Sequence, residues 1–180
     1  MSKRDSTPIA KELRKELAGL IDLFRRPTVR QLTTAGLTAA AYAAVTMLLA
    51  PISYGPIQLR VSEAMTLLPI LFPESVPGLF VGCVIANLMS QYGLPDVVFG
   101  SLATLIAATL TYILRKNTWL AALPPVLINA VIVGWLIWWQ AHEPFFVSAL
   151  TVGGGEALSV YILGFALIAG LKKALPKKYL

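Results

Sequence analysis

Glu156 is the residue of this sequence whose chemistry most needs an explanation. It follows three glycines in the stretch VGGGEALSVYILG, which is otherwise almost wholly apolar. A charged side chain at the centre of a membrane helix costs about 2.5–3.5 kcal/mol unless it is paired, neutralised or turned toward a wet cavity. Either Glu156 is a ligand-binding carboxylate in a cavity, or it is protonated and bonded to a partner such as Asn129. We favour the first hypothesis.

Further polar residues near the ends of apolar segments are candidate ligand contacts. Asn87 lies toward the end of one such segment. Arg60 and Glu63 are three residues apart, so on a helix they can pair with each other as readily as contact a ligand. Asp96 begins another segment, where a carboxylate also stabilises a helix N-terminus without binding anything. Each of these residues could therefore either stabilise the fold or contact a ligand.

The composition is that of an integral membrane protein with one domain. Hydrophobic residues make up 57% of the 180 residues, charged residues 13%, and the mean hydropathy is +0.72. Soluble globular domains carry about 25% charged residues. The net charge of +6 could suggest nucleic acid, but all the Lys and Arg residues except Arg60 lie within 1–30, 115–116 and 172–178. We therefore expect no nucleic-acid partner.

Six apolar segments predict an all-α integral membrane protein, a six-transmembrane-helix bundle. A helix needs about 20 apolar residues to cross a hydrocarbon core about 30 Å thick. The segment EAMTLLPILFP is the weakest candidate, because it is short and contains Pro69. The six segments are 32–49, 63–73, 77–90, 94–114, 119–139 and 145–171.

The positive charges predict the orientation of this bundle. Lys and Arg near helix ends stay on the cytoplasmic side. Six helices would then place both termini in the cytoplasm, in a multi-pass protein of the cell membrane. The predicted parts are a cytoplasmic amphipathic helix and linker (1–30), a transmembrane substrate-binding domain (31–171) and a basic cytoplasmic tail (172–180).

The first thirty residues predict an amphipathic helix. Ile9, Leu13, Leu17, Leu20 and Phe24 recur at helical spacing among charged residues. Such a helix lies on the anionic inner leaflet of a membrane, or it docks onto a partner protein. We favour the membrane surface.

Motifs for catalysis are absent from the sequence. It contains no phosphate-cradling GxxxxGK[ST] loop, no HExxH and no GxSxG. The only histidine, His142, falls in a short predicted outer loop, and the only cysteine, Cys83, falls within an apolar segment. We expect no enzyme activity, no cofactor and no metal site.

Two further features concern an outer loop and the packing of the helices. The loop APISYGPIQLRVSE is too apolar for a solvated linker and is typical of a flap. Tyr54 in this loop and Tyr92 in another outer loop either belong to an interfacial aromatic belt or stack on a ligand. Small residues also recur every four positions, a pattern that lets helices pack closely inside the bundle or against another membrane protein. They are Ala35, Ala39 and Ala43, beside Gly36, Ala40 and Ala44, and, in the third segment, Gly78, Gly82 and Ala86.

The stretches YGPIQLRVSEA, FPE, PGLFVGC and DVVFGSLATL carry a resemblance that covers residues 32–171. The sequence resembles the queuosine-precursor transporters called QueT, which are substrate-binding S components of energy-coupling-factor (ECF) transporters. The resemblance implies a six-helix bundle that captures its substrate from outside and joins a transmembrane coupling subunit and two ATPase subunits. It also implies that Ala35, Ala39 and Ala43 pack on the coupling subunit.

The substrate implied by the resemblance is a 7-deazaguanine such as preQ0, preQ1 or queuine. A guanine-like edge offers adjacent N–H donors to one carboxylate, and its carbonyl accepts from an amide. Glu156 and Asn129 would supply that pair. The aminomethyl cation of preQ1 would meet a second carboxylate, Glu63 or Asp96.

Two other function classes remain open at this point. A stand-alone secondary transporter of a small polar or aromatic solute would also hold buried carboxylates, although no inverted repeat is visible in the sequence. A membrane enzyme or scaffold is the third alternative, and substrate turnover would identify the enzyme.

Overall fold

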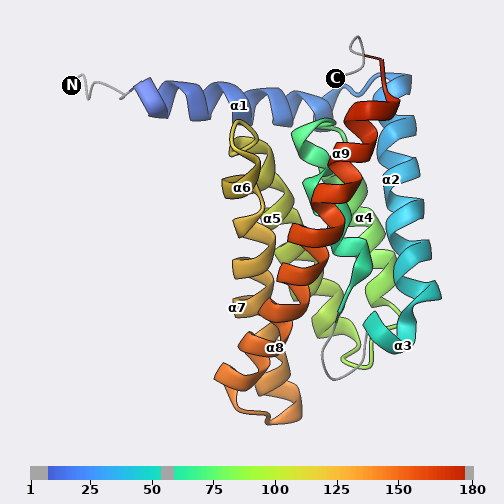
Figure 1. Ribbon diagram of the computed structural model, residues 1–180, viewed down its shortest axis with the longest axis vertical. Helices are drawn as coiled ribbons and strands as arrows, with labels where there is room; N and C mark the ends of the chain where they lie inside the picture. Colours follow the sequence, from blue (N-terminus) through green and yellow to red (C-terminus); the bar gives the residue numbers. More distant parts are fainter. Residues whose placement is uncertain (1–7, 54–58, 177–180) are drawn as a thin grey trace.

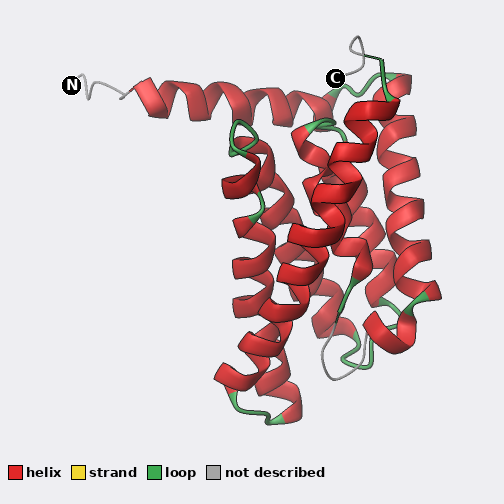
Figure 2. Ribbon diagram, in the orientation of Figure 1, coloured by secondary structure: helices red, strands yellow, loops and turns green. Residues whose placement is uncertain are grey.

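The computed structural model describes residues 8–53 and 59–176, and every regular element in these two ranges is a helix. Helix α1 (Pro8–Arg25) lies across one end of a bundle that the other helices form (Figure 1). Figure 2 shows that loops connect the helices at both ends of this bundle. The predicted all-helical fold is confirmed. Tyr54 lies outside the described residues.

Helical segments run along the bundle, and several of them are built from consecutive elements without a loop between them. The segments are α2 (Val29–Leu48) followed by α3 (Ala50–Ser53); η1 (Val61–Ile70); α4 (Ser75–Asn87); η2 (Asp96–Gly100) with α5 (Ser101–Ile113); α6 (Thr118–Ala121) with α7 (Leu123–Ala141); and α8 (Phe145–Ala157) with η3 (Leu158–Gly164) and α9 (Phe165–Ala174).

Three of these segments are long and apolar enough to cross a membrane. They are 96–113, 118–141 and 145–174, with mean hydropathies of 1.6, 2.2 and 1.7. The weak segment at 63–73 contributes η1, a 3₁₀ helix of 10 residues that contains Pro69. At about 2.0 Å per residue, such a helix reaches about 20 Å, less than the hydrocarbon thickness. The six-helix count therefore stays a prediction.

Basic side chains gather at the end of the bundle where α1 lies, and we call this end the basic end. Figure 1 shows that α1, the start of α6 and the C-terminal end of α9 all lie there. The described basic residues of this end are Lys11, Arg14, Lys15, Arg25, Arg26, Arg30, Arg115, Lys116, Lys172 and Lys173.

Small residues bring α2 and α4 into close contact. A Cβ atom on Gly78 would lie 2.4 Å from the carbonyl oxygen of Ala35, and one on Gly82 would lie 2.7 Å from that of Ala39. Ala39 and Ala43 are buried. The two small-residue ladders of the sequence therefore pack against each other within the chain. Gly36, Ala40 and Ala44 are exposed on another side of α2.

The apolar core consists of clusters that tie these segments together. One joins α2, α4 and α5 and also receives Leu20 of α1. A second joins η1 to η3 and α9 through residues such as Leu67 and Val160. A third joins α7 to α8 through Val133 and Val152. The polar residues described next lie on the same helices, between these clusters.

A methyl group at Gly82 tests the contact between α2 and α4. The neighbouring backbone would have to move, and overpacking of this kind costs about 1–3 kcal/mol. We expect Gly82→Ala to lower the melting temperature of the detergent-purified protein. Gly36→Ala is the matched control, because a Cβ atom there meets nothing within 4 Å. Equal melting temperatures for the two variants would contradict the close contact.

Candidate ligand-binding site

Polar side chains from several helices meet inside the bundle. Each of them is at most 4% exposed, although each comes from a helix with an apolar sequence. They come from η1, α4, η2, α7 and α8, so residues far apart in the sequence form one buried polar cluster. Its acidic and amide members are Glu63, Asn87, Asp96, Asn129 and Glu156.

Glu156 and Asn129 are bonded to each other. The Asn129 Nδ2 atom donates to Glu156 Oε1 over 2.9 Å. Close packing of α7 and α8 allows this, since a Cβ atom on Gly134 would lie 2.9 Å from Ala149 Cα and one on Gly153 would lie 3.2 Å from Ala130 Cβ. The pair named by the structural hypothesis is therefore present. Glu156 Oε2, however, is buried without a hydrogen-bond partner among the described residues.

Glu63 lies in the same cluster and is held by Tyr42 of α2. The Tyr42 hydroxyl donates to Glu63 Oε1. Glu63 is also close enough to Asn129 and to Glu156 to interact electrostatically with both. Its second oxygen, Oε2, has no partner within the described part of the chain. Two carboxyl groups thus flank the Asn129 amide, and each keeps one oxygen unbonded.

Arg60 forms its ion pair with Asp96. The Arg60 Nη2 atom lies 3.3 Å from Asp96 Oδ2, and both side chains are buried. The sequence left open a pair between Arg60 and Glu63, but the salt bridge joins Arg60 to the start of η2. Asp96 therefore does not only add a charge at a helix N-terminus, because its side chain also forms a buried salt bridge. Its backbone carbonyl accepts from Asn87 Nδ2 over 3.0 Å, which links α4 to the same cluster.

Gly100 makes room for this part of the cluster. A Cβ atom there would lie 2.4 Å from Asp96 Oδ1 and 2.8 Å from Asn87 Nδ2. No side chain larger than hydrogen fits at this position unless both polar groups move. η2 is π-helical, as is η3, which begins two residues after Glu156. Single π-helical turns occur frequently at functional sites.

The unbonded atoms of the cluster share one chemical property. When the carboxyl groups are ionised, all four can only accept hydrogen bonds. Buried polar atoms nearly always have a partner, from the protein or from another molecule. The cluster is therefore complementary to a molecule that brings several N–H donors. The four atoms are Glu63 Oε2, Asn87 Oδ1, Asp96 Oδ1 and Glu156 Oε2.

Tyr92 lies beside the cluster on the end opposite the basic end. It packs against the cluster of Val133, Ile137 and Val152, which joins the helices that carry Asn129 and Glu156. Its backbone carbonyl accepts from Gln140 Nε2 over 3.2 Å.

Three features of the cluster were not predicted. Tyr42 was missed, although Thr38, Tyr42 and Thr46 form a polar row at four-residue spacing in an alanine-rich segment. The bond of 2.6 Å between Thr46 Oγ1 and Ser62 Oγ links α2 to η1, and hydroxyl groups give no such signal in a sequence. Gly100 was missed because its role depends on a contact across the helix turn.

The structure also shows the positions of His142 and Cys83. His142 is exposed between α7 and α8, and Cys83 is buried as a free thiol. Among the described residues, no group of His, Cys, Asp and Glu has the arrangement of a metal site.

Comparison with known proteins assigns this helical bundle to a family. A family model described as the QueT transporter matches residues 32–173. The chain belongs to the QueT transporter family. The chain is also 28% identical over 157 residues to the queuosine precursor transporter QueT of Lactococcus lactis subsp. cremoris (strain MG1363), a match that covers 79% of this chain and 92% of the relative. No solved structure matches the chain.

QueT-family membership and the apolar helices together make this chain a membrane protein with a transport role. The match covers every residue of the buried polar cluster and begins after α1. The cluster is thus a feature of the part that is similar to the family, whereas α1 lies outside that part.

Tyr42→Phe tests whether Glu63 depends on the tyrosine hydroxyl. Removing one partner from a buried polar group costs about 1–3 kcal/mol. We expect a lower melting temperature for Tyr42→Phe in detergent. Tyr161→Phe is the matched control, because the Tyr161 hydroxyl donates over 3.3 Å to the Trp119 carbonyl in an exposed position. A Tyr42→Phe variant as stable as the unmodified protein would contradict the role given to this hydroxyl.

Proposed function

We propose that this chain is the substrate-binding membrane subunit, or S component, of an ECF-type ABC transporter. It captures a 7-deazaguanine queuosine precursor from outside the cell, and a coupling transmembrane subunit with two ATPase subunits drives uptake. The observation that carries this proposal is the set of buried acceptor atoms around Glu156. The name of the Lactococcus lactis relative supports the choice of substrate.

The chemistry of a 7-deazaguanine fits the unbonded atoms of the cluster. Its N1–H and exocyclic amine are adjacent donors that one carboxylate can accept. Glu156 Oε2 is available for such a donor. The Asn129 amide has a second N–H beyond the one it gives to Glu156. That N–H would donate to the ring carbonyl. Glu156 and Asn129 would then both bind the pyrimidine edge of the ring.

A second carboxylate in the cluster suits a ligand with a positive substituent. Glu63 carries an unbonded oxygen and is close to both Asn129 and Glu156. The aminomethyl group of preQ1 is a cation, and a buried carboxylate favours it through charge and hydrogen bonding. Asp96 is the weaker candidate, because Arg60 already balances its charge. Asn87 Oδ1 and Tyr92 would complete the contacts on the remaining edge and face of the ring.

The proposed topology has six membrane segments and cytoplasmic termini. The three long spans would be joined by α2, η1 and α4, which run along the same bundle in Figure 1. The basic end faces the cytoplasm under the positive-inside rule. The loops near Tyr92 and His142 would then lie on the outer side, and the ligand would enter from there.

The coupling subunit is proposed to dock along α2. Ala35, Ala39 and Ala43 are the residues proposed for this contact; α4 packs closely on the first two, and the last two are buried in the isolated chain. A partner helix would therefore approach at the edge between α2 and α4. Gly36, Ala40 and Ala44, which are exposed beside them, allow that close approach.

Glu156→Gln tests the site directly. The substitution keeps the shape of the side chain but replaces one acceptor oxygen by a donor, which would face the N–H groups of the ligand. We expect 7-deazaguanine affinity, measured by calorimetry on the purified protein, to fall by about tenfold or more, equivalent to about 1.4 kcal/mol. Glu143→Gln, in an exposed loop, is the control. Unchanged affinity in Glu156→Gln would remove this residue from the site.

Glu63→Gln tests the second carboxylate. We expect the unmodified protein to bind preQ1 more tightly than the uncharged preQ0, and Glu63→Gln to lose about tenfold in preQ1 affinity with a smaller change for preQ0. Calorimetry with preQ0, preQ1 and queuine measures this directly. An equal loss for preQ0 and preQ1 would show that Glu63 does not meet the substituent.

Uptake assays separate the S component from a stand-alone secondary transporter. Vesicles that contain this chain together with the coupling and ATPase subunits should accumulate preQ1 only when ATP is supplied. Accumulation by the chain alone, driven by a proton or sodium gradient, would instead identify a secondary transporter.

A further inference from the structure

Helix α1 has an apolar side that the rest of the described chain covers only in part. Leu20 is 6% exposed and packs into the cluster of α2, α4 and α5. Its neighbours on the same side of the helix are much less covered. Their exposed fractions are 37% for Leu13, 38% for Leu17, 54% for Ile21 and 52% for Phe24.

The position of α1 relative to the bundle is fixed by specific contacts. Arg115, which follows α5, forms two short contacts with Glu16: Nη1 to Oε2 at 2.9 Å and Nη2 to Oε1 at 3.0 Å. The Arg115 guanidinium also lies over the Tyr112 ring at 4.1 Å. Only the Nη2 contact has the geometry of a hydrogen bond, and the Nη1 contact is a charge contact. α1 is thus held by Glu16 and Leu20, with one side turned toward the bundle.

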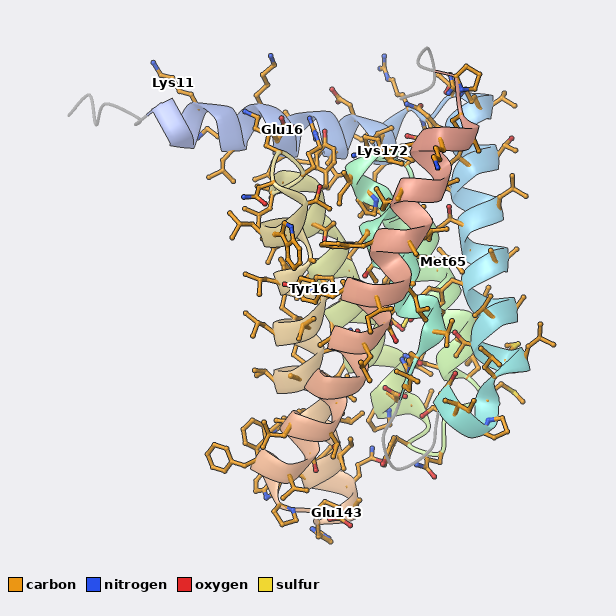
Figure 3. The ribbon with its side chains drawn as sticks, viewed as in Figure 1. Lys11, Glu16, Met65, Glu143, Tyr161 and Lys172 are labelled. Carbon is orange, nitrogen blue, oxygen red and sulfur yellow. The ribbon has the colours of Figure 1, made fainter. Side chains whose placement is uncertain are left out.

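This orientation determines what the uncovered apolar residues face. Figure 1 shows α1 lying across the end of the bundle and extending beyond it on one side. In Figure 3, Glu16 is directed toward the bundle and Lys11 away from it. Leu13 lies three residues before Glu16, and Leu17 lies one residue after it. Both leucines are therefore on the same broad side of the helix as Glu16. They therefore face the region beside the bundle, which the bilayer fills.

The basic residues of α1 lie where lipid headgroups would be. Ile21 and Arg25 are four residues apart, and Arg14 and Arg25 are eleven apart, so the two arginines lie in line beside the apolar side. Arg side chains in this position extend to the lipid phosphates while their stems cover apolar surface. Lys15 and Arg26 lie on the opposite side of the helix.

We propose that α1 is an interfacial anchor that binds an anionic lipid surface, with its apolar side in the acyl boundary and Arg14 and Arg25 on the phosphates. Charge complementarity and the placement of α1 across the end of a membrane bundle favour lipid over a partner protein. The contacts between Glu16 and Arg115 connect this anchor to the bundle. The proposal is independent of the ligand and of the transport partners.

Site-specific labelling tests the depth of α1. Leu17→Cys and Ala18→Cys would each be labelled with nitrobenzoxadiazole in the full chain, reconstituted in vesicles of phosphatidylglycerol and phosphatidylcholine. The unmodified protein gives the background, because its only cysteine, Cys83, is buried. We expect lipids brominated on the acyl chain to quench the label at position 17 about twofold more than at position 18. Equal quenching, as for a helix that awaits a protein partner, would overturn the proposal.

A pair of double variants tests the requirement for anionic lipid. In the Leu17→Cys background, Arg14→Gln with Arg25→Gln should reduce quenching in phosphatidylglycerol vesicles to the level seen in pure phosphatidylcholine. Lys15→Gln with Arg26→Gln removes the same charge from the opposite side and should retain most of the quenching. Equal loss in the two double variants, or quenching that does not depend on phosphatidylglycerol, would overturn the role given to Arg14 and Arg25.

Discussion

A buried oxygen atom that can only accept a hydrogen bond needs a donor, and this requirement underlies the account of the molecule. In a membrane bundle, water is not generally available to supply that donor, and an unsatisfied polar group costs several kcal/mol. Glu63 and Glu156 each keep one such oxygen beside the Asn129 amide. In the function we propose, a ligand rich in N–H groups satisfies both oxygen atoms, and these atoms then contribute to its affinity and specificity.

Close helix packing is what brings these side chains together. Glycines let α7 approach α8, so Asn129 reaches Glu156, and they let α4 approach α2, the helix whose Tyr42 contacts Glu63. Because no hydrophobic effect drives helix association inside lipid, small residues and buried polar contacts carry more of this task. The residues that we propose for ligand binding therefore also take part in contacts between the helices.

The sequence predicted the parts of this arrangement that depend on composition and local spacing. Long apolar stretches predicted the three segments that are long enough to span a membrane, and a carboxylate in apolar surroundings predicted the pair of Glu156 and Asn129 across two helices. Other partners across helices could not be predicted. Arg60 pairs with Asp96 at the start of η2, although Glu63 is much nearer in the sequence. Tyr42 could not be identified either, because a tyrosine in a membrane helix is usually explained by burial or by the interface.

A structure of the protein with bound preQ1, determined by crystallography or electron microscopy, tests the central claim most directly. The account predicts the pyrimidine edge of the ring within hydrogen-bond distance of Glu156 Oε2, with the Asn129 amide at the ring carbonyl and Glu63 at the aminomethyl group. A ligand bound elsewhere, with Glu156 still bonded only to Asn129, would contradict it.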